Sequence, residues 1–115
     1  MNEAQIDIQQ LRIKHILYKS KVRSVAFGGQ FDQHFFSSTG PVSEWFYTVG
    51  NKKYANLAEI QQLQRVNNLL TSSAGKVFSL YNSGQIDEAH ESLKEIETLS
   101  EQFQKLLDQL EKRFK

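Results

Sequence analysis

The sequence predicts an all-α fold, an antiparallel four-helix bundle made of three long helices and one short aromatic helix. Apolar residues recur at alternating spacings of three and four along three long stretches, which is typical of helices that each bury one face. Glycines follow the first two stretches, at Gly28-Gly29 and Ser83-Gly84, and the only proline, Pro41, stands where a short helix would begin. Short connections between helices favour antiparallel neighbours, which completes the expected architecture.

Length and composition limit the other possibilities. With 115 residues, the chain is expected to form a single domain over residues 1–115. It has no cysteine, which excludes disulfides and thiolate metal ligands. No apolar run approaches the roughly 20 residues that cross a bilayer, and residues 1–10 do not resemble a signal peptide, so we expect a cytoplasmic protein without a membrane partner. A net charge of +1 argues against nucleic acid as a partner.

The first helix is expected to begin with Asn2 as its N-cap and to end at Gly28-Gly29. Its other faces carry the basic residues Arg12, Lys14, Lys19, Lys21 and Arg23. Its inner seam consists of Ile8, Leu11, His15, Tyr18, Val22 and Val25. His15 is therefore expected inside the bundle.

Residues 30–40 show no sustained period and are expected to form a loop. Pro41 then favours a short helix over residues 42–49, which Gly50-Asn51 would close. This helix carries three consecutive aromatic residues, Trp45, Phe46 and Tyr47. We expect them to cover one end of the bundle.

The central helix is expected to begin at Asn56, which forms a capping-box pattern with Glu59, and to end near Ser83-Gly84. Asn67 interrupts its apolar seam, and a buried amide without partners costs roughly 1 to 3 kcal/mol. Thr71 follows one turn later on the same side. The seam consists of Asn56, Ile60, Leu63, Asn67, Leu70, Ala74, Val77 and Tyr81.

The last helix has the most regular seam and an acidic outer face, which would lie opposite the basic first helix. Its seam consists of Ile86, Ala89, Leu93, Ile96, Ser100, Phe103, Leu107, Leu110 and Phe114. If the first and central helices pack side by side, His15 and Asn67 project into one core, where bundles commonly build binding sites.

Three segments carry a family resemblance: His15-Ile16-Leu17-Tyr18-Lys19, then Trp45-Phe46-Tyr47 followed by Gly50, Tyr54, Leu57 and Leu63, then Tyr81-Asn82-Ser83-Gly84-Gln85-Ile86-Asp87-Glu88-Ala89. Together they resemble the chemoreceptor zinc-binding domain family over nearly the whole chain. The resemblance implies a four-helix bundle with a buried zinc held by three histidines and a cysteine. It also implies a role in bacterial chemotaxis or signal transduction, with a chemoreceptor or diguanylate cyclase output module as partner, in cis or in trans.

The family's ligand positions are mostly lost in this sequence. His15, with Tyr18 three residues later, matches the first ligand. The cysteine position falls on Gly40, with Ser38 and Thr39 as alternatives in the diverged loop, and the two later histidines fall on Asn67 and Thr71. Zinc needs sulfur, imidazole or carboxylate ligands, so we expect no zinc and no other cofactor. His34 could enter from its loop as a substitute ligand. Otherwise His15, Asn67 and Thr71 would form a remnant binding pocket, with Asn67 and Thr71 hydrogen-bonded to His15.

We therefore expect a non-enzymatic sensory or regulatory domain of bacterial signal transduction that forms a homodimer. No catalytic residues are predicted, because the sequence has no Ser/His/Asp grouping and no phosphate loop. One alternative is a histidine phosphotransfer bundle that uses His90, although the flanking Glu88 and Glu91 would repel phosphate. A second alternative is a plain dimerisation module.

Overall fold

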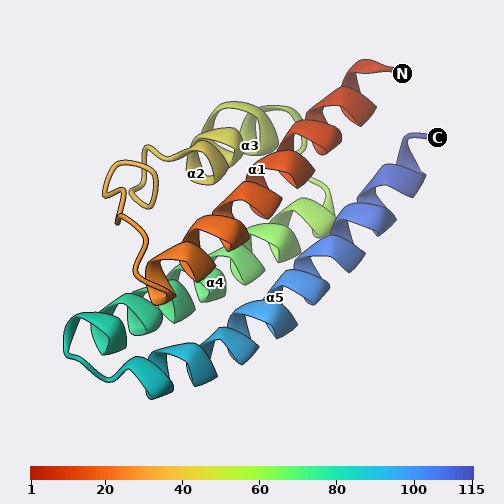
Figure 1. The fold of residues 1–115 in the computed structure, drawn as a ribbon. Coiled ribbons are helices and arrows are strands. Elements are labelled where there is room, and N and C mark those ends of the chain that lie inside the picture. The colour runs from red at the N-terminus through yellow and green to blue at the C-terminus, as the bar shows by residue number, and fades with distance from the viewer.

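The computed structural model describes residues 1–115, which form an all-helical protein. The elements are α1 (Glu3–Ala26), α2 (Pro41–Trp45), the π-helical turn η1 (Phe46–Gly50), α3 (Asn51–Lys53), α4 (Ala58–Asn82) and α5 (Ile86–Arg113). The three long helices pack on one another, with α1 and α4 running in the same direction and α5 running back beside both (Figure 1). The short segment from Pro41 to Lys53 lies against α1 and runs opposite to it (Figure 1).

Helix α1 begins and ends as its sequence predicts. The side chain of Asn2 accepts a hydrogen bond from the Gln5 amide at 2.9 Å, and the Gln5 side chain accepts one from the Asn2 amide at 3.0 Å. Gly28 ends the helix at a φ of +95°, a conformation that favours glycine. All six residues of the predicted inner seam are buried. Asn2 also donates to the carbonyl oxygen of Phe114 at 2.9 Å, which ties the two ends of the chain together.

The short segment from Pro41 to Lys53, called the aromatic segment below, differs from its prediction. It does not close at Gly50-Asn51, because Gly50 has a helical φ of −58° and the helix continues to Lys53. Gly50 serves packing instead: a Cβ there would lie 2.7 Å from the Trp45 ring. Trp45 and Phe46 are buried, whereas Tyr47 is 75% exposed and is not part of the core.

Helix α4 begins differently from its prediction and ends as predicted. Its N-cap is Leu57, and no side chain caps it, so the predicted capping box of Asn56 and Glu59 is wrong. The Glu59 carboxylate instead accepts a hydrogen bond from the Arg113 guanidinium at 2.6 Å, which joins the start of α4 to the end of α5. At the other end, Gly84 has a φ of +83° and terminates the helix.

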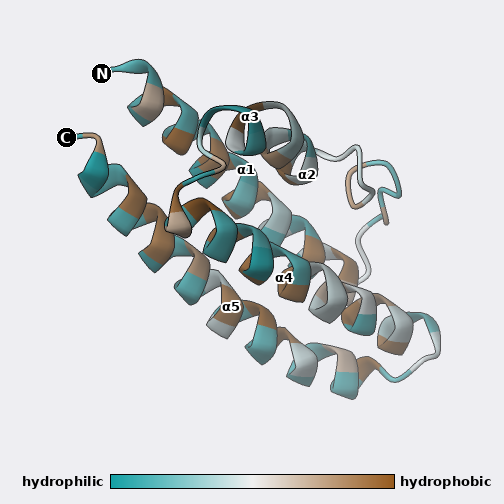
Figure 2. Cartoon of the chain, turned by 180° about the vertical axis from the view of Figure 1, so that it is seen from behind, coloured by the Kyte–Doolittle hydropathy of each residue, from teal (hydrophilic) through white to brown (hydrophobic).

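The core lies between the three long helices and extends to Val42, Trp45 and Phe46 of the aromatic segment. Hydrophobic and hydrophilic residues alternate around each long helix, as Figure 2 shows. Ion pairs join the basic outer positions of α1 to the acidic ones of α5: Arg12 to Asp108 and Glu111 at 3.1 and 3.0 Å, and Lys19 to Glu97 at 2.8 Å. The expected opposition of the two charged helices is confirmed.

Aromatic side chains of the loop between α1 and α2 pack against the C-terminal halves of α1 and α4. Phe31 and Phe36 both contact Phe78 of α4, with ring centroids 5.0 and 4.8 Å apart. Tyr18 of α1 contacts Phe35 and Phe36. The predicted loop is therefore irregular in backbone but packed by its own rings.

Candidate functional site

His15 lies at the centre of the packed helices and is 1% exposed. Its Nε2 is 2.8 Å from the hydroxyl of Ser100 on α5, and its ring stacks on Phe103 with centroids 4.2 Å apart. Its Nδ1 is buried without a partner. Assigning the ring proton to Nε2 leaves only a lone pair unpaired at Nδ1, which is the less costly arrangement because orphaned N–H donors are the rarer defect in proteins.

Burial, with a smaller contribution from the charge of Lys19, lowers the pKa of His15 from 6.5 to about 4. The imidazole is therefore neutral at pH 7. In that state it acts as a hydrogen-bonding and stacking link between α1 and α5, not as a carrier of protons.

Asn67 and Thr71 of α4 lie together at the edge of the core. The Thr71 hydroxyl donates to the backbone carbonyl of Asn67 at 3.0 Å. Burial raises the pKa of the neighbouring Tyr18 hydroxyl, and a hydrogen bond with Thr71 partly offsets this rise. Both predicted residues thus line a surface hollow, and Tyr18 joins them from α1.

The structure does not bring His15 into this hollow. The predicted hydrogen bonds from Asn67 and Thr71 to His15 are wrong, because Nε2 of His15 faces Ser100 and its Nδ1 has no partner. The physical reason is the register of the seams: the polar edge of the His15 ring meets α5, where Ser100 occupies the matching position. Tyr18, one turn further along α1, is the residue that reaches the α4 pair.

Two adjoining hollows of about 200 and 180 Å³ make up the site, and they share Ser38, Ser43, Asn67 and Asn68. We call them the uncharged pocket, because none of their lining residues is charged. The lining residues are Tyr18, Phe35, Phe36, Ser37, Ser38, Val42, Ser43, Phe46, Tyr47, Asn51, Gln64, Asn67, Asn68 and Thr71.

The chemistry of the uncharged pocket is that of neutral hydrogen bonding. Carboxamides offer both donors and acceptors, and serine, threonine and tyrosine hydroxyls do the same. Lys, Arg, Asp and Glu make up 27 of the 115 residues, yet none of them enters the lining. Such a site has no group with which to neutralise a charged ligand, whereas a neutral polar ligand would be matched.

The positions that the family resemblance assigns to zinc do not fit that metal. A side chain at Gly40 would overlap the carbonyl oxygen of Phe35, so the loop in this conformation has no room for a ligand there. Asn67 and Thr71 offer only amide and hydroxyl groups, which bind zinc poorly. Throughout the chain, no three His, Asp or Glu side chains gather in a way that could hold a metal ion.

His34 lies in a different part of the surface. Its Nδ1 is 3.3 Å from the hydroxyl of Thr39, and its side chain lines an open hollow of about 430 Å³ with Lys14 and Glu44. His15 does not line that hollow. The structure therefore does not bring His34 together with the other three predicted positions.

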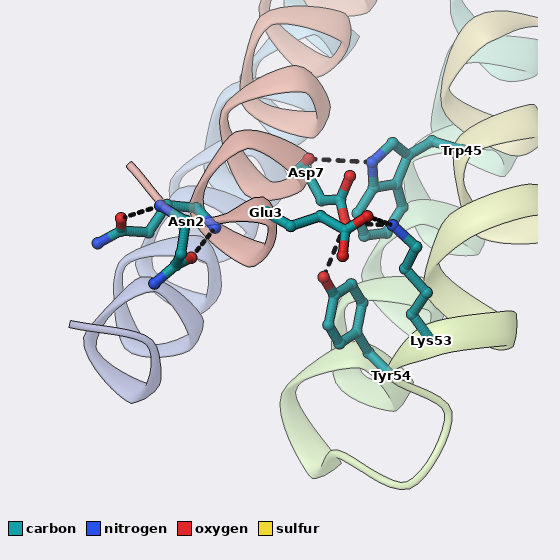
Figure 3. A network of polar contacts seen from close by, with 7 residues as sticks. Asn2, Glu3, Asp7, Trp45, Lys53 and Tyr54 are labelled. Atoms are coloured by element: carbon teal, nitrogen blue, oxygen red, sulfur yellow. Dashed lines mark hydrogen bonds and ion pairs between the residues drawn. The ribbon is translucent and has the colours of Figure 1, made fainter.

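Sequence analysis missed a polar cluster that surrounds Asp7 (Figure 3). The Asp7 carboxylate is buried and accepts hydrogen bonds from Lys53 at 3.0 Å and from the Tyr54 hydroxyl at 2.7 Å. Its backbone carbonyl accepts one from the Trp45 indole at 3.0 Å, and Glu3 pairs with Lys53 at 3.0 Å. An acidic residue on the inner face of the first helix was the available signal, since a buried carboxylate requires partners.

His90 is held at the junction of α1 and α5. Its Nε2 lies 2.6 Å from the carbonyl oxygen of Ala26, so this nitrogen is the donor, and its ring stacks on Phe27 with centroids 4.1 Å apart. An imidazole nitrogen whose N–H donates a hydrogen bond to a carbonyl has no lone pair in the ring plane with which to act as a nucleophile.

Comparison with models of known families, with curated proteins and with solved structures gave no match to this chain. None of its helices is both long and apolar enough to pass through a membrane.

Proposed function

We propose that this chain is a non-enzymatic sensory or regulatory domain of bacterial signal transduction, cytoplasmic, and similar to chemoreceptor zinc-binding domains but without their zinc. In this proposal the aromatic segment serves as the short fourth helix of an antiparallel bundle. The observation that carries the proposal is the uncharged pocket, because it opens between helices that a bound ligand could hold in one arrangement.

The position of the pocket supports a sensory role. It lies between α4, the Tyr18 turn of α1 and the loop that leads into α2. A ligand that hydrogen-bonds to Asn67 and to Ser38 or Ser43 would join α4 to that loop or to α2. These hydrogen bonds would stabilise one arrangement of the loop relative to the others. Such a preference is the physical requirement for transmitting a signal to an output module.

A melting assay with uncharged polar metabolites tests the proposal. A ligand that binds only the folded state raises the melting temperature by mass action, and we expect at least one neutral compound to do so. Asn67→Leu should abolish the rise, since it keeps the side-chain size and removes the hydrogen bonds. Gln109→Leu, at an exposed position of α5, is the matched control and should leave the rise intact. A screen in which only charged compounds act, or in which Asn67→Leu changes nothing, would rule out this pocket.

The absence of zinc is a separate expectation of the same proposal. Metal analysis of the purified protein should find no stoichiometric zinc, and added zinc should not raise the melting temperature. One zinc per chain would mean that the ligands lie elsewhere than at the positions considered above.

Dimerisation is the second candidate function, and an exposed apolar stripe on α1 favours it. Ile6, Ile13 and Leu17 fall on one side of α1, away from its buried face, and are 45%, 65% and 45% exposed. Ile16 beside them is 50% exposed. The phosphotransfer alternative has less support, because Nε2 of His90 donates a hydrogen bond to the carbonyl oxygen of Ala26 and the ring stacks on Phe27.

A further inference from the structure

A hollow of about 240 Å³ lies between the second half of α1 and the first half of α5, away from the uncharged pocket. Its hydrophobic lining residues are Phe27, Leu93 and Ile96. Its rim carries charged residues of both helices, among them Lys19, Arg23 and Glu97. Apolar side chains next to charged ones suit a small organic molecule that carries both a hydrocarbon part and a charge.

The charges at the rim leave one cation without a partner. Lys19 pairs with Glu97 at 2.8 Å, and Lys94, which also lines the hollow, pairs with Glu91 at 2.8 Å. Arg23 makes no ion pair with any carboxylate of the chain, whereas Arg12, Lys19 and Lys21 of the same helix each pair with at least one. The hollow therefore presents a single uncompensated guanidinium, which is matched by a single negative charge.

The hollow also contains an aromatic ring, that of Phe27, in a fixed position. Phe27 is 60% exposed, yet its ring stacks on the imidazole of His90 with an interplanar angle of 19°. His90 is itself fixed by its hydrogen bond to the carbonyl oxygen of Ala26. The Arg23 guanidinium lies 5.7 Å from the centre of the Phe27 ring, so charge and ring face the same space.

We propose that this hollow binds a small aromatic monocarboxylate, with the carboxylate on Arg23 and the ring against Phe27. A guanidinium matches a carboxylate with two parallel hydrogen bonds, and a ligand ring gains from edge-to-face contact with the exposed Phe27 side chain. Glu97 at the rim disfavours ligands with a second negative charge. This site does not depend on the uncharged pocket, so either proposal can fail without the other.

Three probes separate the parts of the proposal: sodium benzoate, benzamide and sodium acetate. Benzamide keeps the ring and loses the charge, whereas acetate keeps the charge and loses the ring. In titrations followed by amide NMR shifts, benzoate should saturate and shift residues 19–27 and 90–97. Benzamide and acetate should each bind at least about tenfold more weakly, since each lacks one of the two contacts.

Two variants locate the binding. Arg23→Gln removes the charge at an exposed position, so the fold should persist, and benzoate affinity should fall about tenfold to the level of benzamide. Lys14→Gln removes a charge elsewhere on α1 and should leave benzoate binding unchanged. The proposal is overturned if benzoate does not saturate, if benzamide binds equally well, if the shifts lie outside these two segments, or if Arg23→Gln binds benzoate as the parent does.

Discussion

At the scale of single residues, His15 shows how a polar side chain can occupy a helical core. Its neutral ring is accommodated by one hydrogen bond to Ser100 and by stacking on Phe103. The charged form has no acceptor at Nδ1 and no nearby carboxylate to compensate it. The core therefore tolerates this residue only while it is uncharged.

The pH dependence of stability should report this preference. Because the folded pKa of His15, about 4, lies below the unfolded value of 6.5, its contribution is fully present above pH 6.5 and is lost as the pH falls toward 4. The loss is about 3 kcal/mol. Denaturant melts of the parent and of His15→Gln between pH 7 and pH 4 measure it, and the variant should lose less stability than the parent. Gln109→Leu, at an exposed position of α5, is the control and should follow the parent; equal slopes for the parent and His15→Gln would contradict the assignment.

Two glycines provide a second prediction at this scale, with opposite signs. A Cβ at Gly75, on the exposed side of α4, meets no atom within 4 Å, so Gly75→Ala should stabilise the protein by roughly 0.5 to 1 kcal/mol through helix propensity. Gly40→Ala should destabilise it by roughly 1 to 3 kcal/mol, because its Cβ would overlap the Phe35 carbonyl. Thermal melts of both variants check this, and a neutral Gly40→Ala would show that the loop adapts freely.

Sequence reasoning was sufficient for some site residues and not for others. Asn67 and Thr71 were found because a carboxamide interrupts an apolar stripe, and the structure places both at one hollow. The partner of His15 was not found, because a one-residue difference in register decides which side chain meets the ring. Seam spacing places Ser100 inside the bundle but gives no information on its angular position relative to His15.

At the scale of elements, the aromatic segment is attached to α1 mainly through Asp7. Its carboxylate and backbone carbonyl accept three hydrogen bonds from residues 45–54 (Figure 3). Asp7→Ala leaves the Lys53 ammonium and the Tyr54 hydroxyl without their buried acceptor and should cost roughly 1 to 3 kcal/mol in unfolding free energy. Glu3→Ala removes the exposed partner of the same Lys53 and should cost under about 1 kcal/mol. Comparable costs in chemical denaturation would show that Asp7 is no more important than a surface ion pair.

The loss of stability at high pH provides a second test of this attachment. Hydrogen bonds with Glu3 and Asp7 raise the pKa of Lys53 from 10.5 to about 12, and burial together with Asp7 raises the pKa of Tyr54 from 10.0 to about 12. Because both pKa values are higher in the folded than in the unfolded protein, the stability that Lys53 and Tyr54 contribute is fully present below about pH 10. It is lost as the pH rises through 12. The parent should therefore lose more stability than Asp7→Ala between pH 10 and pH 12 when both are melted in denaturant.

Helix ends were predictable where glycine or a local cap determines them and not where a distant residue does. Asn2 and Gln5 cap α1 within four residues of sequence, and Gly28 and Gly84 end their helices at positive φ. At the start of α4 no side chain caps the helix, and Glu59 pairs instead with Arg113, which lies 54 positions away. The helix that continues past Gly50 likewise depends on packing against Trp45, and no local pattern reports that contact.

At the scale of the whole molecule, the apolar stripe on α1 predicts a homodimer. Ile13→Lys should disrupt it, because the charge would enter the centre of the stripe, whereas Ile86→Lys, at the start of α5, should not. Light scattering at micromolar concentration should give about twice the 13.3 kDa chain mass for the parent and for Ile86→Lys, and the chain mass for Ile13→Lys. A parent protein that scatters as a monomer would contradict the prediction.

The connections between the long helices have a consequence for the order of folding. Helices α4 and α5 are joined by the turn at residues 83–85, so their contacts form after closure of a very short loop. Helix α1 reaches the same core only after residues 27–57 close a much longer one. We expect the α4–α5 hairpin to nucleate folding and α1 to join it late. Core substitutions in the hairpin, such as Leu70→Ala, should then slow folding, whereas Leu11→Ala should mainly accelerate unfolding.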